Sequence, residues 1–136
     1  MNLFTLDTLY QLQENTAKNT TTNPIPNTPT PNDTYIIILK LTARWCAPCK
    51  SITPVCHSFM DVWGKTYGNR IIFHEIDIDE NPQFYSLLKK YKIVRGVPAL
   101  LCYDKDKIRD VFPADMVNTG DKIEVIHFFN RSLGLL

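Results

Sequence analysis

The chain has 136 residues, the length of one domain, and 44% of them are hydrophobic, an ordinary share for a globular protein. Lysine and arginine number 15 against 14 acidic residues, so the net charge is close to zero. That balance provides no electrostatic basis for binding nucleic acid or an anionic membrane, and the 4 cysteines are too few for a disulfide scaffold at this length.

The N-terminal stretch MNLFTLDTLYQLQEN lacks the basic start and the long apolar run of a signal peptide. Nowhere does the sequence reach the roughly 18 to 20 consecutive apolar residues that cross a bilayer. We therefore expect a monomer in the cytoplasm or another reducing intracellular compartment, with neither nucleic acid nor a membrane as a partner.

The beginning of the chain predicts a short strand followed by a helix within residues 2–14, with Thr5 as the N-cap. Residues 15–34 are a polar tract of Asn, Thr and Pro with almost nothing to bury. Its prolines are incompatible with a helix; they are Pro24, Pro26, Pro29 and Pro31. The tract is interpreted as a disordered or mobile insertion within a single domain, residues 1–136.

From Tyr35 onward, strands and helices alternate. The run YIIILKLTA, residues 35–43, is apolar on both faces except at Lys40, which is typical of a central, buried strand. The further elements expected are a helix from Cys46 to about residue 65 with Pro54 inside it, a strand at 70–79, a helix at 81–93, a strand at 98–104, a second strand in IRDVFP at 108–113 that closes a hairpin, and a helix at 118–134. This order predicts a three-layer α/β/α sandwich with a mixed central sheet.

The core and the last helix can also be predicted. In the helix at 118–134, Ile123, Ile126 and Leu133 recur at helical spacing, and Gly134 ends it. Two cysteines are interpreted as small buried hydrophobic residues, namely Cys56 and Cys102. The aromatic residues expected in the core are Phe59, Trp63, Phe73, Phe128 and Phe129.

The stretch ARWCAPCKS, residues 43–51, contains two cysteines that could hold a metal, form a structural bridge, or cycle between dithiol and disulfide. Placed at the first turn of a helix, Cys46 faces unpaired backbone N–H groups and the helix dipole, which stabilise a thiolate and lower its pKa below about 8.5. Cys49 lies on the same turn, but deeper. Cys46 can then attack a disulfide and Cys49 can resolve the mixed disulfide, while Trp45 offers an exposed apolar face and Pro48 fixes the backbone.

Zinc binding is the less favourable interpretation of these residues. Cys46, Cys49, Cys56 and His57 would have to supply the ligands from one continuous helix, which spreads them along about three turns. His74 and His127 are interpreted as core-edge or surface residues. We therefore expect no metal and no cofactor beyond the redox-active disulfide.

Three motifs in the same order resemble the thioredoxin family: ARWCAPCKSITP, EIDIDENP and YKIVRGVPALL. The resemblance covers residues 35–134. It implies a thioredoxin fold, a Cys46 nucleophile and a resolving Cys49. It also implies a cis-proline at Pro98, whose preceding residue Val97 pairs with substrate as an added strand. Trp45, Ala47 and Pro48 complete the substrate-binding residues by the same resemblance.

The chain departs from the family most clearly at Lys40. Six residues before the first cysteine, thioredoxins usually carry a buried Asp that helps to remove a proton from the second cysteine. By the same alignment Glu75 occupies a position where bacterial members place a lysine and some other members a glutamate. We expect Lys40 and Glu75 to pair beneath Cys49 with reversed charges, as a proton relay or to stabilise the thiolate. The alternative is that Lys40 reaches solvent past the sheet edge without a role.

Three smaller departures concern the rim of the site. Ala47 replaces the usual Gly between the cysteines, and Thr42 replaces an aromatic residue behind them. Many thioredoxins have a Gly-Ala pair after the last strand at the edge of the substrate groove, and Pro113-Ala114 is assigned to that position.

Two classes of function follow from the resemblance. The first is a thiol–disulfide oxidoreductase that reduces disulfides in other proteins, with a thioredoxin reductase as a possible electron donor. The second is a thioredoxin-fold binding or scaffold module with little redox turnover. Within the first class a disulfide isomerase or oxidase is a further alternative, although those members usually carry His or Tyr where this chain has Pro48.

Overall fold

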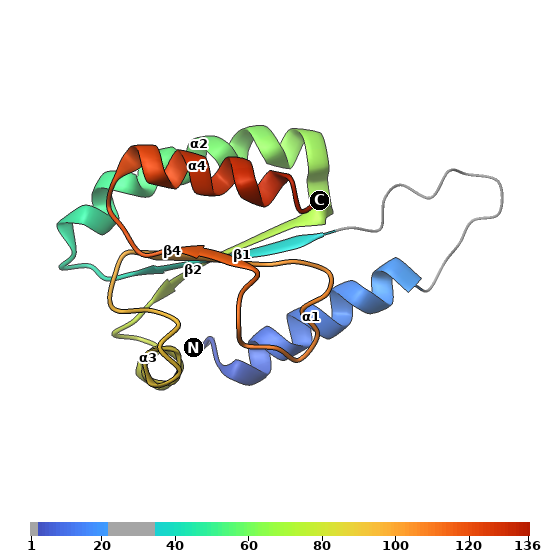
Figure 1. Ribbon diagram of the computed structural model, residues 1–136, viewed down its shortest axis with the longest axis horizontal. Coiled ribbons are helices and arrows are strands. Elements are labelled where there is room, and N and C mark those ends of the chain that lie inside the picture. Colours follow the sequence, from blue (N-terminus) through green and yellow to red (C-terminus); the bar gives the residue numbers. More distant parts are fainter. Residues whose placement is uncertain (1–2, 22–34) are drawn as a thin grey trace.

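The computed structural model describes residues 3–21 and 35–136, which form a mixed sheet covered by helices on both faces (Figure 1). In chain order the elements are α1 (Leu6–Thr21), β1 (Ile36–Thr42), α2 (Ala47–Tyr67), the 3-10 turn η1 (Gly68–Arg70), β2 (Ile71–Asp77), α3 (Pro82–Lys90), β3 (Ala99–Tyr103), β4 (Asp115–Val117) and α4 (Lys122–Leu133). Helices α2 and α4 cover one face, and α1 and α3 cover the other. The predicted three-layer α/β/α architecture is confirmed. Within the described residues, no helix is long and apolar enough to span a membrane.

Strand β1 lies inside the sheet, whose strand order is β2-β1-β3-β4. It runs parallel to β2 and antiparallel to β3, so the sheet is mixed as predicted. The register places Lys40 beside Glu75 on β2 and beside Leu100 on β3. Neighbours on both sides and helices on both faces explain why β1 is apolar almost throughout.

The core has one half on each face of the sheet. On the α2 and α4 side it includes Cys56 and Cys102, which are fully buried as predicted. A cluster of aromatic rings joins the two helices there, with the Phe59 and Phe129 rings stacked 4.8 Å apart. The predicted core aromatics are buried or packed against this half; they are Phe59, Trp63, Phe73, Phe128 and Phe129.

The N-terminal region differs from its prediction in two ways. Residues 3–5 form no strand, and α1 continues to Thr21 instead of ending near residue 14. The N-cap is confirmed, because Thr5 Oγ1 accepts a hydrogen bond from the Thr8 N–H at 3.1 Å. The helix can extend because the prolines that exclude helix begin only at Pro24. The remaining part of the predicted insertion, residues 22–34, lies outside the described residues.

The predicted hairpin strand at 108–113 is wrong, and the strand that pairs with β3 is β4. The buried side chain of Gln13 on α1 explains the difference. Its Nε2 donates to the Asp110 carbonyl at 2.8 Å, and its Oε1 accepts from the Asp110 N–H at 3.0 Å. The backbone N–H and carbonyl of Asp110 therefore pair with a side chain on α1 and take no part in strand pairing. Pro113 has no N–H to donate, so pairing with β3 begins at Ala114, whose N–H donates to the Cys102 carbonyl at 2.8 Å.

The last two helices also differ in detail. Helix α3 ends at Lys90 rather than residue 93. Helix α4 begins after Asp121, whose side chain caps it. The predicted stripe on α4 is wrong at two positions, since Ile123 is 64% exposed and Ile126 is exposed as well. Its third member, Leu133, packs against the core, and Gly134 ends the helix as predicted. The buried face consists of Val125, Phe128, Phe129 and Ser132. The two aromatic rings bury more apolar surface than the isoleucines would, so they determine the face.

Candidate active site

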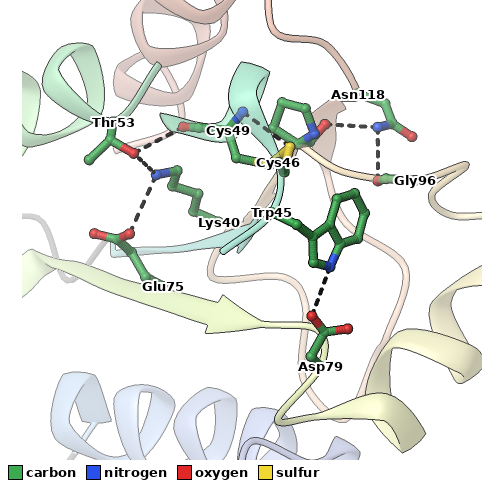
Figure 2. The surroundings of a disulfide bond; sticks show 10 residues. Lys40, Trp45, Cys46, Cys49, Thr53, Glu75, Asp79, Gly96 and Asn118 are labelled. Atoms are coloured by element: carbon green, nitrogen blue, oxygen red, sulfur yellow. Dashed lines mark hydrogen bonds and ion pairs between the residues drawn. A yellow bond between two sulfur atoms is a disulfide. The ribbon is translucent and has the colours of Figure 1, made fainter. Parts of the chain in front are cut away.

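The two motif cysteines lie at the start of α2 and are joined as a disulfide (Figure 2). Cys46 is the N-cap, and its sulfur accepts a hydrogen bond from the Cys49 N–H at 3.2 Å. Pro48 occupies the first turn, where a missing N–H breaks no helical bond. Cys46 is 4% exposed and Cys49 is 0% exposed. As predicted, Cys49 is the deeper of the two.

The residues around the cysteines form an exposed rim. Trp45 is 67% exposed, and its Nε1–H donates to Asp79 Oδ2 at 2.8 Å (Figure 2). Ala47 and Pro48 are exposed as well. The contact fixes the indole ring beside the disulfide without covering it.

The peptide bond between Val97 and Pro98 is cis, as the resemblance implied. Val97 packs against the part of the core that also contains Cys46 and Cys49. The loop is held by Asn118, which directly follows β4 (Figure 2). Its amide donates to the Gly96 carbonyl at 3.1 Å and to the Pro98 carbonyl at 2.8 Å. The Asn118 side-chain oxygen accepts from the backbone N–H of Arg95 at 2.6 Å.

Gly120 approaches the cysteine helix closely. A Cβ added to it would lie 2.7 Å from the Pro48 Cβ, too close for carbon atoms of two residues distant in sequence. The chain that borders the disulfide after the last strand is therefore Asn118 to Gly120. Pro113-Ala114, which the sequence placed in this role, comes before β4 and not after it. The error follows from the wrongly predicted strand at 108–113.

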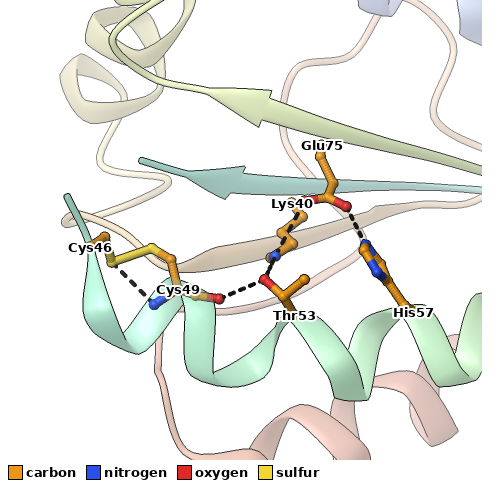
Figure 3. Close-up of polar contacts among 6 residues, drawn as sticks. All are labelled: Lys40, Cys46, Cys49, Thr53, His57 and Glu75. Atoms are coloured by element: carbon orange, nitrogen blue, oxygen red, sulfur yellow. Dashed lines mark hydrogen bonds and ion pairs between the residues drawn. A yellow bond between two sulfur atoms is a disulfide. The ribbon is translucent and has the colours of Figure 1, made fainter. Parts of the chain in front are cut away.

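Lys40 is completely buried beneath Cys49 and has two polar partners (Figure 3). Its Nζ donates to Thr53 Oγ1 at 2.6 Å and lies 3.4 Å from Glu75 Oε2. The Thr53 hydroxyl in turn donates to the Cys49 carbonyl at 2.9 Å. The predicted ion pair between Lys40 and Glu75 is confirmed, whereas escape of Lys40 to solvent is wrong. The buried ammonium is therefore both paired with a carboxylate and hydrogen-bonded to a hydroxyl, as a charge inside a protein must be.

Glu75 has a second partner that the sequence did not reveal. His57 Nε2 lies 2.6 Å from Glu75 Oε1, so the carboxylate bridges a buried lysine and a half-exposed histidine (Figure 3). Burial alone would raise the pKa of Glu75. The hydrogen bond from His57 and the charge and hydrogen bond of Lys40 together outweigh burial and hold that pKa below its usual value.

The sequence spacing along α2 could have indicated Thr53 and His57 as part of the site. Cys49, Thr53 and His57 follow one another at intervals of four residues, which places them on one face of a helix. That face lies over Lys40 and Glu75. No comparable signal marks Asn118 or Gly120, because their roles depend on contacts with segments distant in sequence.

The remaining cysteines and histidines do not join the site. Burial raises the pKa of the Cys56 thiol to about 11 and that of Cys102 to about 12, so neither is a ready nucleophile. His74 lies on the opposite face of β2 beside the Phe4 ring, and His127 is exposed on α4. Among the described residues no group of His, Cys, Asp and Glu side chains has a geometry that could hold a metal ion.

Comparisons with known proteins agree with this geometry. A family model described as Thioredoxin matches residues 27–129. A thioredoxin from Buchnera aphidicola subsp. Baizongia pistaciae is 33% identical over 97 residues, which cover 71% of this chain and 78% of that protein. A thioredoxin from Acidithiobacillus ferridurans is 30% identical over 97 residues, covering 71% and 79%. The X-ray structure of Fasciola hepatica thioredoxin superposes with a TM-score of 0.61 at 18% identity, over 96% of each chain.

An α/β sandwich that carries a cysteine pair at a helix N-terminus, joined as a disulfide, defines a thiol–disulfide oxidoreductase. The chain belongs to the thioredoxin family. Proteins of this family act on protein disulfides and need no cofactor other than their own cysteine pair.

Proposed function

We propose that this protein reduces disulfides in other proteins, with Cys46 as the nucleophile and Cys49 as the resolving cysteine. The observation that carries the proposal is the position of the pair, with Cys46 at the N-cap of α2 and Cys49 buried behind it. The helix N-terminus favours the thiolate of the outer cysteine. The deeper cysteine reaches no substrate directly, but it can reach Cys46.

The reaction then proceeds in two balanced steps. The Cys46 thiolate attacks one sulfur of a substrate disulfide, the substrate S–S bond breaks, and the electron pair leaves with the second substrate sulfur. The Cys49 thiolate next attacks the Cys46 sulfur and displaces the first substrate sulfur as a thiolate. The protein ends as the Cys46–Cys49 disulfide, and the substrate has gained two electrons and two protons.

Lys40 and Glu75 support the second step. The resolving cysteine must lose its proton in a buried place, where a bare thiolate is costly. A lysine charge about 6 Å from a thiolate, at an effective dielectric near 20, is worth roughly 3 kcal/mol, or about two pKa units. The Lys40 ammonium beneath Cys49 supplies a positive charge, and the Glu75 carboxylate is its counter-ion.

The substrate binds over the exposed rim. Trp45, Ala47 and Pro48 form an exposed apolar surface beside the disulfide. Next to it, Val97 presents its backbone to an extended substrate segment as an added strand. Asn118 supports this role, since it fixes the carbonyls of Gly96 and Pro98 on either side of Val97.

The wider setting of the reaction follows from the same chemistry. A protein that donates two electrons per cycle must be reduced again, and a thioredoxin reductase is the donor that the family suggests. Such a cycle belongs to the cytoplasm or another reducing compartment, where thiols are regenerated. The near-zero net charge provides no attraction toward nucleic acid or an anionic membrane, which leaves other proteins as the expected partners.

Trapping experiments with single cysteine variants test the proposal. The Cys49→Ser variant should accumulate a stable mixed disulfide between Cys46 and a protein substrate such as oxidised insulin, because the resolving thiol is missing. The Cys46→Ser variant should neither form that adduct nor reduce insulin. Cys56→Ser, which changes a buried thiol elsewhere on α2, is the control and should turn over normally. Turnover by Cys46→Ser, or no insulin reduction by the unaltered chain, would contradict the proposal.

A further inference from the structure

His57 forms a connection that the proposed reaction does not use. It sits on α2 two turns after Cys49, and its side chain is 53% exposed. Through Glu75 Oε1 at 2.6 Å it is linked to a carboxylate whose other oxygen faces the fully buried Lys40 at 3.4 Å. The chain of contacts from solvent therefore runs His57, Glu75, Lys40, Thr53 and the Cys49 carbonyl (Figure 3).

The charge beneath Cys49 depends on how Glu75 is shared. With His57 neutral, the Glu75 carboxylate offsets part of the Lys40 charge that acts on Cys49. With His57 protonated, the same carboxylate is also neutralised from the solvent side, and more of the Lys40 charge acts on Cys49. Histidine is the side chain whose charge ordinarily changes between about pH 5 and 8.

Other charges near His57 are few. Glu75 from β2 contacts it directly, and Lys40 from β1 contacts the other oxygen of that carboxylate. Asp77 lies one pleat further on the same face of β2, where Arg44 at 3.7 Å partly neutralises it. On α2 itself the helical spacing brings two charges to the same side, namely Lys50 and Asp61. Glu75 is therefore the group through which a charge on His57 reaches the cysteines most directly.

We propose that His57 is a positioning residue for the second step of the reaction, which makes the attack of Cys49 on Cys46 less sensitive to acid. It holds Glu75 Oε1 so that Oε2 faces Lys40, and its protonation strengthens the positive field beneath Cys49. The proposal rests on the proposed function, because it concerns the resolving step of that cycle.

Protonation of His57 should raise the fraction of Cys49 that is present as thiolate at acidic pH. Without help, the fraction of Cys49 present as thiolate falls tenfold for each pH unit below its pKa. A protonated His57 stabilises the Cys49 thiolate and so offsets part of that fall. The two side chains are about 12 Å apart along the helix, from 1.5 Å per residue. At that distance a charge changes the thiolate population by roughly two- to tenfold for effective dielectrics between 80 and 20.

Stopped-flow measurement of both steps tests the idea. The reduced protein is mixed with the chromogenic disulfide dithiobis(nitrobenzoate), whose first thiolate is released by Cys46 and whose second is released when Cys49 attacks. The rate of the second phase, at reagent levels where it is independent of concentration, is followed from about pH 5.5 to 9. The variants are His57→Gln, which keeps a hydrogen-bond donor for Glu75 but does not titrate, and His127→Gln, which removes an exposed histidine on α4.

The expected result is a second phase that is about two- to tenfold faster in the unaltered chain than in His57→Gln at the acidic end, with the two rates converging at the alkaline end. His127→Gln should follow the unaltered chain throughout. Equal rates at every pH would overturn the proposal, and so would a constant ratio at every pH, because that indicates only a structural hydrogen bond. Absence of the first phase would instead contradict the role of Cys46, so the two failures are distinguishable.

Discussion

Lys40 shows how a charged residue can occupy the middle of a buried strand. A lysine that loses its solvent is destabilised by several kcal/mol unless its charge is matched. Here the match comes from neighbouring elements, since Glu75 is its register partner on β2 and Thr53 lies on α2 above it. The Thr53 hydroxyl in turn donates a hydrogen bond to the Cys49 carbonyl. A methionine of similar volume would fill the same space, so the proposed role of Lys40 rests on the position of its charge beneath Cys49.

Replacing Lys40 by methionine tests that function. Lys40→Met keeps the volume of the side chain and leaves Thr53 and Glu75 with their other partners, so the free energy of unfolding should change by no more than about 1 kcal/mol. The rate at which Cys49 resolves a mixed disulfide should fall about tenfold or more at pH 7, because the thiolate loses its cation. Lys50→Met, which removes an exposed lysine next to Cys49, is the control. An unchanged pH profile of disulfide exchange in Lys40→Met would show that the lysine has no part in the chemistry.

Glu75 should make the stability of the fold sensitive to acid. Its pKa in the folded protein lies below its usual value, so its contribution is fully present above the unfolded pKa of about 4.3 and is lost as the pH falls through the folded pKa. Glu75→Gln should therefore be less stable than the unaltered chain near pH 7, and the difference should shrink below about pH 4. Urea denaturation across this range measures it. Asp61→Asn, at an exposed site on α2, controls for the loss of a negative charge, and a Glu75→Gln difference that does not change with pH would contradict the account.

At the scale of elements, the apolar runs of β1 and β2 and the helix α2 could be predicted because local pattern decides them. A short run rich in β-branched residues and apolar on both faces favours a buried strand. The absence of a strand at 108–113 could not be predicted, because it depends on Gln13, which lies 97 residues away from Asp110 in sequence. The face of α4 was also misjudged, since the spacing of Ile123 and Ile126 competed with the larger rings of Phe128 and Phe129. Periodicity alone does not decide between two such faces.

Gly120, in the connection between β4 and α4, is a position where a single added methyl group should matter. In Gly120→Ala the new Cβ would lie 2.7 Å from Pro48 in the rigid first turn of α2, so either the segment after β4 or the cysteine helix must move. We expect a loss of about 1 to 3 kcal/mol in the free energy of unfolding, together with slower disulfide exchange. Gly64→Ala is a matched control, because its Cβ meets nothing within 4 Å in the interior of α2. It should stabilise the helix by about 0.5 to 1 kcal/mol, and equal effects of the two changes would rule out the steric explanation.

At the scale of the whole molecule, the site exists only where five separate segments meet. The cysteines come from α2, the ion pair from β1 and β2, the cis-proline loop from the approach to β3, and Asn118 with Gly120 from the end of β4. The sequence identified the cysteines, Pro98 and the Lys40–Glu75 pair because each sits in or next to a recognisable motif. It did not identify Asn118 or Gly120, whose roles arise from contacts between distant segments, or the link to His57, for which the spacing along α2 was the available signal.

The central claim is that the Cys46–Cys49 pair cycles as a reductant, and its reduction potential tests that claim most directly. The protein is equilibrated in defined thiol buffers, the free cysteines are alkylated, and the fraction of disulfide is read by mass. The account predicts a value near −270 mV, typical of a thioredoxin that reduces other proteins. A value between about −180 and −120 mV would contradict it, because the pair would then act as an isomerase or oxidant. A pair that never forms a disulfide in these buffers would contradict it as well and would favour a binding module.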